Sequence, residues 1–68
     1  MKKFIVQKAV GNHYTTIGMY EHKKDALQAG ERFFREITEK CRVVCIRTEV
    51  DADGHIDRSK YELYNIWW

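Results

Sequence analysis

An acidic run near the C-terminal end of the sequence could hold a metal ion. Counting from Glu49, carboxylates occupy the first, third, fifth and ninth places of a twelve-residue stretch, and Gly54 occupies the sixth. This spacing is close to the calcium loop of an EF-hand. The twelfth place holds Lys60, a cation where calcium requires a bidentate Glu. We therefore interpret the run as a hairpin turn shaped by Asp53 and Gly54, and predict no metal there.

Histidines and cysteines supply a second set of potential metal ligands: His13, His22, His55, Cys41 and Cys45. The two cysteines are four residues apart, which is longer than the pairs typical of zinc ribbons, and no second pair follows. We interpret these residues as three surface imidazoles and a core thiol at Cys41 or Cys45. Because Cys45 lies within a run of Val and Ile, burial should raise its pKa and make it inert.

Catalysis requires a nucleophile beside an oriented base, or paired carboxylates in a sheltered cleft. The sequence contains no glycine-rich phosphate loop and no nucleophile elbow. It predicts a protein that is not an enzyme, with no catalytic residue and no cofactor.

Nucleic-acid binding is the alternative function, because cations and aromatic residues are interleaved along the predicted strands. A sheet face of this kind could stack bases and hold phosphates. The candidate residues are Arg42, Arg47, Arg58, Lys60, Tyr14 and Tyr20. The competing interpretation is that the aromatic side chains form the core and the cations protect strand edges from aggregation. One shared direction of the cations would favour nucleic acid, and scattered directions would favour protein interaction.

Five elements must position these residues. Two β-rich runs, 2–10 and 14–21, flank a Gly-Asn turn and predict a hairpin. Residues 22–40 predict one amphipathic helix. Its apolar stripe consists of Ala26, Gly30, Phe33, Phe34, Ile37 and Cys41. Residues 42–50 and the segment from Tyr61 onward predict a second pair of strands. Gly30 costs the helix about 1 kcal/mol relative to Ala, and we expect close approach to a sheet in return.

The order β-β-α-β-β predicts an α+β fold of two layers, with a four-stranded antiparallel sheet and one helix on one face. Strict alternation in the last strand would place Tyr61, Leu63, Asn65 and Trp67 on one face, and Glu62, Tyr64, Ile66 and Trp68 on the other. One helix covers only one face of a sheet. The other face should therefore expose aromatic surface, which usually marks an interaction site.

Composition sets the remaining bounds. The chain has 68 residues, enough for a single domain spanning 1–68, and nine aromatic residues, enough for a folded core. The net charge of +2 is a weak basic excess with both signs interspersed, unlike the stripe of a dedicated nucleic-acid binder. The N-terminal apolar run breaks at Gln7 and Lys8, too early for the core of a signal peptide. We expect a cytoplasmic protein with no membrane partner.

Two segments carry a resemblance to a known group of proteins. "YEHKKDALQAGERF" joins a strand end to a helix start, and "VVCIRTEVDADGHI" leads a strand into an Asp-x-Asp-Gly turn. In these motifs the chain resembles small ββαββ domains of unknown function from gut Firmicutes and their mobile elements. The resemblance covers most of the chain and implies the fold and the turn. It implies no activity, substrate or catalytic residue.

The leading functional hypothesis is a non-enzymatic interaction module. It rests on more aromatic surface than one helix can bury. We expect association into a homodimer, or with another protein, through the uncovered sheet face or an edge strand. The candidate residues are Tyr61, Tyr64, Trp67 and Trp68.

Overall fold

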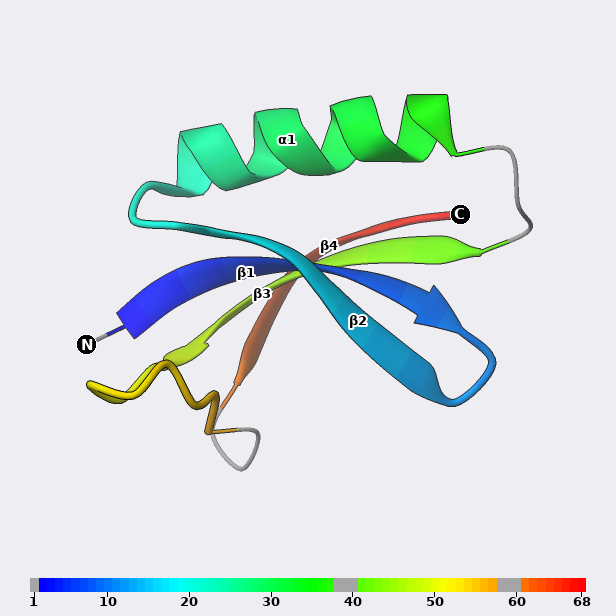
Figure 1. Cartoon of the computed structure of the whole chain (residues 1–68). Helices are drawn as coiled ribbons and strands as arrows, with labels where there is room; N and C mark the ends of the chain where they lie inside the picture. The colour runs from blue at the N-terminus through cyan, green and yellow to red at the C-terminus, as the bar shows by residue number, and fades with distance from the viewer. Residues whose placement is uncertain (1, 38–40, 58–60) are drawn as a thin grey trace.

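The computed structural model describes residues 2–37, 41–57 and 61–68. These form β1 (Lys2–Val10), β2 (His13–Tyr20), α1 (Lys23–Glu36), β3 (Arg42–Glu49) and β4 (Glu62–Trp67). The helix lies across one face of a four-stranded antiparallel sheet, as predicted (Figure 1). Among the described residues, none belongs to a helix that is long and apolar enough to cross a membrane.

The strands lie in the order β2-β1-β3-β4. In the central pair, Ile5 lies opposite Ile46, and Val6 lies opposite Cys45. β1 and β3 are the central strands and pair on both edges. They also hold most of the buried strand residues. β2 and β4, with few buried residues, are the edge strands. The sequence pattern had left the place of the first strand open.

The helix is shorter than predicted. It ends at Glu36, and Ile37 has extended backbone angles while its N–H still donates to the carbonyl of Phe33. Cys41 precedes β3 and is not part of the helical stripe. Residues 38–40 lie outside the described residues. Glu31 and Arg35 form the expected i,i+4 ion pair at 2.7 Å.

Small residues face the sheet from α1. The buried helical residues are Ala26, Ala29 and Gly30. The indole of Trp67 lies against Gly30, so that a Cβ built there would be 2.5 Å from a ring carbon. The expected close approach is therefore confirmed: an absent side chain on α1 makes room for the largest side chain of β4.

One cluster of buried residues lies between α1 and the sheet. It consists of Val6, Ala26, Val43 and Cys45. Phe4 and Tyr64 pack beside it, with ring centroids 5.2 Å apart in an edge-on arrangement. This cluster is the core that the amphipathic pattern of the helix predicts.

A second buried cluster lies on the face of the sheet that α1 leaves uncovered. Ile5 and Ile46 contribute from the central strands, and Val50 and Ile56 contribute from the connection after β3. Figure 1 shows this connection, in yellow, on the side of the sheet away from the helix. The hydroxyl of Thr48 donates to the carbonyl of Asp57 and fastens it to the sheet. The second face is therefore covered at this end by the connection, which folds back over it, in addition to the cover that the helix gives to the first face.

The alternation predicted for the last strand is also wrong. Cys45 pairs with Asn65 and Ile46 pairs with Leu63, which leaves Tyr64 as the extra residue of a β-bulge. A bulge reverses the inward and outward assignment of the residues beyond it. Tyr64 and Trp67 both pack under α1, whereas Leu63 and Ile66 lie together on the other face.

Candidate functional site

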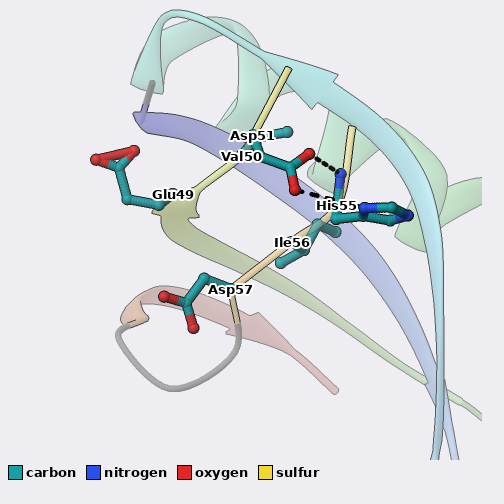
Figure 2. Close-up of a pocket in the computed structure, with 6 residues that line it drawn as sticks. All are labelled: Glu49, Val50, Asp51, His55, Ile56 and Asp57. Carbon is teal, nitrogen blue, oxygen red and sulfur yellow. Dashed lines mark hydrogen bonds and ion pairs between the residues drawn. The ribbon is translucent and has the colours of Figure 1, made fainter. Parts of the chain in front are cut away.

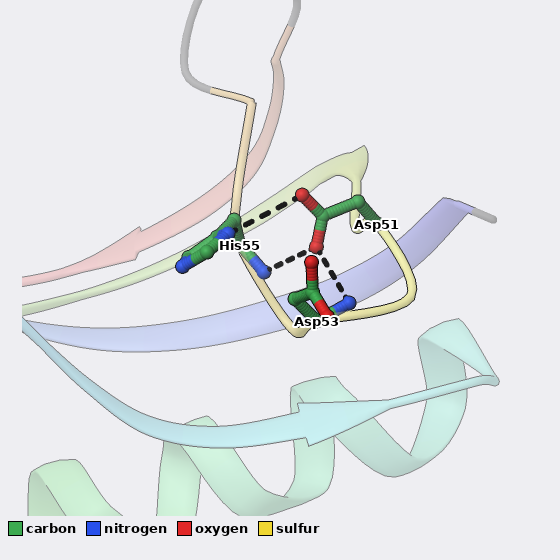
Figure 3. Close-up of side chains that lie close together, drawn as sticks. All are labelled: Asp51, Asp53 and His55. Carbon is green, nitrogen blue, oxygen red and sulfur yellow. Dashed lines mark hydrogen bonds and ion pairs between the residues drawn. The ribbon is translucent and has the colours of Figure 1, made fainter.

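The acidic run forms a tight turn built around Asp51. One carboxylate oxygen of Asp51 accepts the backbone N–H groups of Asp53, at 2.9 Å, and His55, at 2.8 Å. The N–H of Gly54 donates to the carbonyl of Asp51 at 3.0 Å, and Gly54 has a φ of 84°. Figure 3 shows the Asp51 carboxylate turned toward the backbone it caps. The turn prediction is confirmed, although Asp51 rather than Asp53 supplies the capping side chain.

The carboxylates that suggested a calcium loop do not gather in one place. Ligand atoms of Asp51, Asp53 and His55 lie within 4.8 Å of one another, and all three side chains are exposed. Glu49 and Asp57 point away from this group, on the other side of a shallow hollow of about 420 Å³ (Figure 2). Because one oxygen of Asp51 is already committed to the backbone, the arrangement serves the turn better than an ion.

The same hydrogen bonds affect the ionisation of Asp51. The N–H of His55 is the main cause that holds the pKa of the Asp51 carboxyl below its ordinary value of 3.8, and the N–H of Asp53 acts in the same direction. The imidazole of His55, 3.4 Å from the other oxygen, adds a smaller effect of the same sign.

Two substitutions at Asp51 should separate its charge from its capping role. We expect Asp51→Ala to lower the melting temperature at neutral pH, because two turn N–H groups lose their acceptor, and Asp51→Asn to lower it less. Since the folded pKa is depressed, the contribution of the charge is present above pH 3.8 and is lost as the pH falls through the folded value. As the pH is lowered through the acidic range, the melting temperature should therefore fall more steeply for the natural chain than for Asp51→Asn. Parallel curves would contradict the assignment.

The other potential ligands match their structural interpretation. His13, His22 and His55 are exposed and far apart in the sequence, and His22 is the N-cap residue of α1 without a side-chain cap. Both cysteines are free thiols, and Cys45 is buried. Burial raises the pKa of the Cys45 thiol, against a smaller opposing effect of the Lys23 charge. A thiol in this state is a poor nucleophile at neutral pH.

A groove of about 250 Å³ lies on the face of the sheet away from α1, beyond the end that the connection covers. We call it the open-face groove. Val44 and Ile46 are among its buried lining residues. Exposed apolar side chains surround them: Tyr14 is 43% exposed, Leu63 is 53% exposed and Tyr61 is 58% exposed. The remaining lining residues are Gln7, Arg42 and Ile66.

The four predicted interaction residues are divided between two surfaces. Tyr61 lines the open-face groove, and Trp68 is 77% exposed, with its ring 5.5 Å from the guanidinium of Arg42. Tyr64 and Trp67 are partly buried under α1. Two of these four aromatic side chains therefore contribute to the helix-side core, and the other two remain exposed.

The predicted nucleic-acid residues are also divided. Arg42 lines the open-face groove, whereas Arg47 lies over the ring of Phe4 on the helix side, 5.6 Å from its centroid. Tyr14 lies on the open face and Tyr20 packs against the helix-side core. Arg58 and Lys60 lie outside the described residues. Arg42 and Arg47 are separated by an odd number of positions on one strand, so their opposite directions follow from the period of two.

Sequence reasoning missed the residues that build the groove itself. Leu63 and Ile66 were assigned to opposite faces, and the bulge at Tyr64 brings them to one. Val44 was recognised only as a strand residue. The spacing of Leu63 and Ile66 could have indicated the groove. Two strand residues three apart lie on the same face only if a β-bulge adds one residue between them.

Comparison of the chain with protein-family models, with curated proteins and with solved structures gives no match. The resemblance to small bacterial ββαββ domains therefore stays an expectation.

Proposed function

We propose that the protein is a non-enzymatic interaction module that self-associates through its open-face groove. The observation that carries the proposal is the set of three exposed apolar side chains, Tyr14, Tyr61 and Leu63, around a buried aliphatic floor. Contiguous apolar surface of this kind on a soluble protein usually marks an interface.

A second copy is a suitable partner on energetic grounds. A domain of this length buries only about 60% of its unfolded surface and is commonly supported by a metal, disulfides or association. The two cysteines are free. Two open faces packed against each other would cover both sets of aromatic side chains, in the manner of stacked sheets about 10 Å apart.

The charges of the described residues support protein rather than nucleic acid as the partner. The lining of the groove contains one charged residue, Arg42, and its guanidinium already lies over Trp68. Arg47 lies over Phe4 on the opposite face. A phosphate backbone requires several cations on one surface, and Arg42 and Arg47 do not share one.

Sedimentation of two matched variants should test the proposal. We expect the natural chain to sediment as a dimer at micromolar concentration, and Leu63→Lys to sediment as a monomer, because the lysine would bring charge into the apolar contact. Leu63 is 53% exposed, so the monomer should remain folded. The control is Val10→Lys, which makes the same change at an aliphatic side chain that is 44% exposed outside the groove. That variant should remain dimeric.

Two results would count against the proposal. A natural chain that is monomeric throughout the micromolar range would exclude self-association. Equal dissociation of the Leu63→Lys and Val10→Lys variants would place the contact outside the open-face groove.

A further inference from the structure

A second groove lies between α1 and β4, on the side of the sheet opposite the open-face groove. It has a volume of about 600 Å³. We call it the edge groove. Its apolar lining residues are Leu27 from the helix and Trp67 from the strand. The polar lining residues are Lys23, Lys24, Gln28, Glu31 and Asn65.

The edge groove runs beside an unpaired strand edge. β4 is the last strand in the order β2-β1-β3-β4, so within the described part of the chain no strand pairs with its outer edge. β4 begins with the exposed, charged Glu62, whereas its remaining residues, Leu63 to Trp67, include no charged side chain. Strand edges without such protection readily accept a further strand. An extended peptide added here would place alternate side chains in the edge groove and on the open face.

The charges of the edge groove are arranged along its length. The ammonium of Lys23 lies 4.9 Å from the ring centroid of Tyr64, whereas Gly30 lies against Trp67. α1 and β4 therefore run in the same direction. Lys23 and Lys24 lie at the end where both elements begin, and Glu31 lies toward the other.

The net charge of the lining is positive. Glu31 is paired with Arg35 at 2.7 Å, whereas neither Lys23 nor Lys24 forms an ion pair with any residue that the structure describes. Asp25, the acidic residue of the same helical turn, is not among the lining residues. A strand antiparallel to β4 would end beside the two lysines. The charge of this site is thus complementary to acidic residues at the C-terminal end of such a strand.

We propose that the edge groove binds an extended peptide that pairs antiparallel with β4, carries apolar side chains toward Leu27 and Trp67, and ends in acidic residues beside Lys23 and Lys24. This site is separate from the open-face groove and does not depend on self-association. The backbone edge would provide affinity and the lysines would provide direction.

The experiment uses an N-terminally labelled peptide of the length of β4, in which valine and threonine alternate. Two aspartates are added at its C-terminal end. Fluorescence anisotropy should show saturable binding that weakens as salt is added. Binding should weaken about tenfold in the Lys23→Gln/Lys24→Gln variant, because two charge contacts are lost. It should change little in Lys2→Gln/Lys3→Gln, which removes the same charge from β1. A peptide ending in two lysines should bind more weakly than the acidic one.

Backbone N-methylation distinguishes strand addition from simple charge attraction. In a strand paired with β4, the N–H groups of every second residue point toward β4. One version of the peptide is methylated at these residues, and the other version is methylated at the residues between them. Only one version should lose binding. Absence of saturable binding, equal loss in both lysine variants, or equal binding of both methylated peptides would each overturn the proposal. Sedimentation at saturating peptide should show the same state of association as the protein alone; a change in that state would place β4 in the self-association contact and overturn the separation of the two sites.

Discussion

Replacing Gly30 with alanine should destabilise the protein, although the same change stabilises most helices. Alanine is favoured over glycine within a helix by about 1 kcal/mol. At this position the new Cβ would lie 2.5 Å from one carbon of the Trp67 ring and 2.6 Å from the next, so the indole or the helix must move. Overpacking of this kind costs about 1 to 3 kcal/mol. We therefore expect a net loss of about 1 kcal/mol in the free energy of unfolding, measured by urea denaturation.

A second background shows whether Trp67 is the cause. In a Trp67→Leu chain the ring is absent, and Gly30→Ala should there raise stability by its helix propensity alone, about 1 kcal/mol. The difference between the two backgrounds is the coupling energy of the pair. A stabilising effect of Gly30→Ala in the natural background would show that the indole moves aside at no cost, and would contradict the close packing of α1 on β4.

Removing the side chain of Ile5 should strongly destabilise the protein. Ile5 is 0% exposed, although it faces away from α1. Truncation of a buried isoleucine to alanine costs about 2 to 5 kcal/mol. A domain of this length has a total stability of roughly 3 to 10 kcal/mol, so Ile5→Ala should remove a large part of it.

The comparison that gives this result meaning is Val6→Ala. Val6 is also 0% exposed, but it lies in the helix-side cluster. If Val50 and Ile56 form a true core with Ile5, the two truncations should be of similar severity in urea denaturation. Val10→Ala, at an exposed site, should change stability by less than about 0.5 kcal/mol. An effect of Ile5→Ala as small as that of Val10→Ala would show that the connection does not cover the second face in solution.

Both faces of this small sheet are covered, each in a different way. On the first face, a glycine on α1 and a tryptophan on β4 permit close packing. On the second face, a turn capped by Asp51 returns the chain so that Ile56 pairs with Val50 and covers Ile5. Among the residues that the structure describes, those of the open-face groove remain uncovered. The proposed self-association would cover them, and the edge groove would remain available for a peptide.

The sequence by itself determined the class of fold and the nature of the acidic turn. The apolar stripe of α1, the β-branched runs of β1 and β3 and the turn residues at Gly11 and Gly54 are local signals, because each depends on neighbours within a few positions. Lys60 in the closing position of the calcium pattern was likewise visible in the chain alone. So was the burial of Cys45, since its neighbours in β3 are apolar.

Only the tertiary structure decided which apolar surfaces remain exposed. Strand order depends on pairing between segments far apart in the chain, and short connections allow more than one arrangement. The bulge at Tyr64 depends on the register of β4 against β3, and it brings Leu63 and Ile66 to one face while Trp67 lies on the other. Residues 50–57 fold back and pack over Ile5, and no periodic pattern in the sequence predicts this packing. For these reasons the sequence predicted exposed aromatic surface, whereas the fold determined that the exposed apolar side chains around the aliphatic floor of the groove are Tyr14, Tyr61 and Leu63.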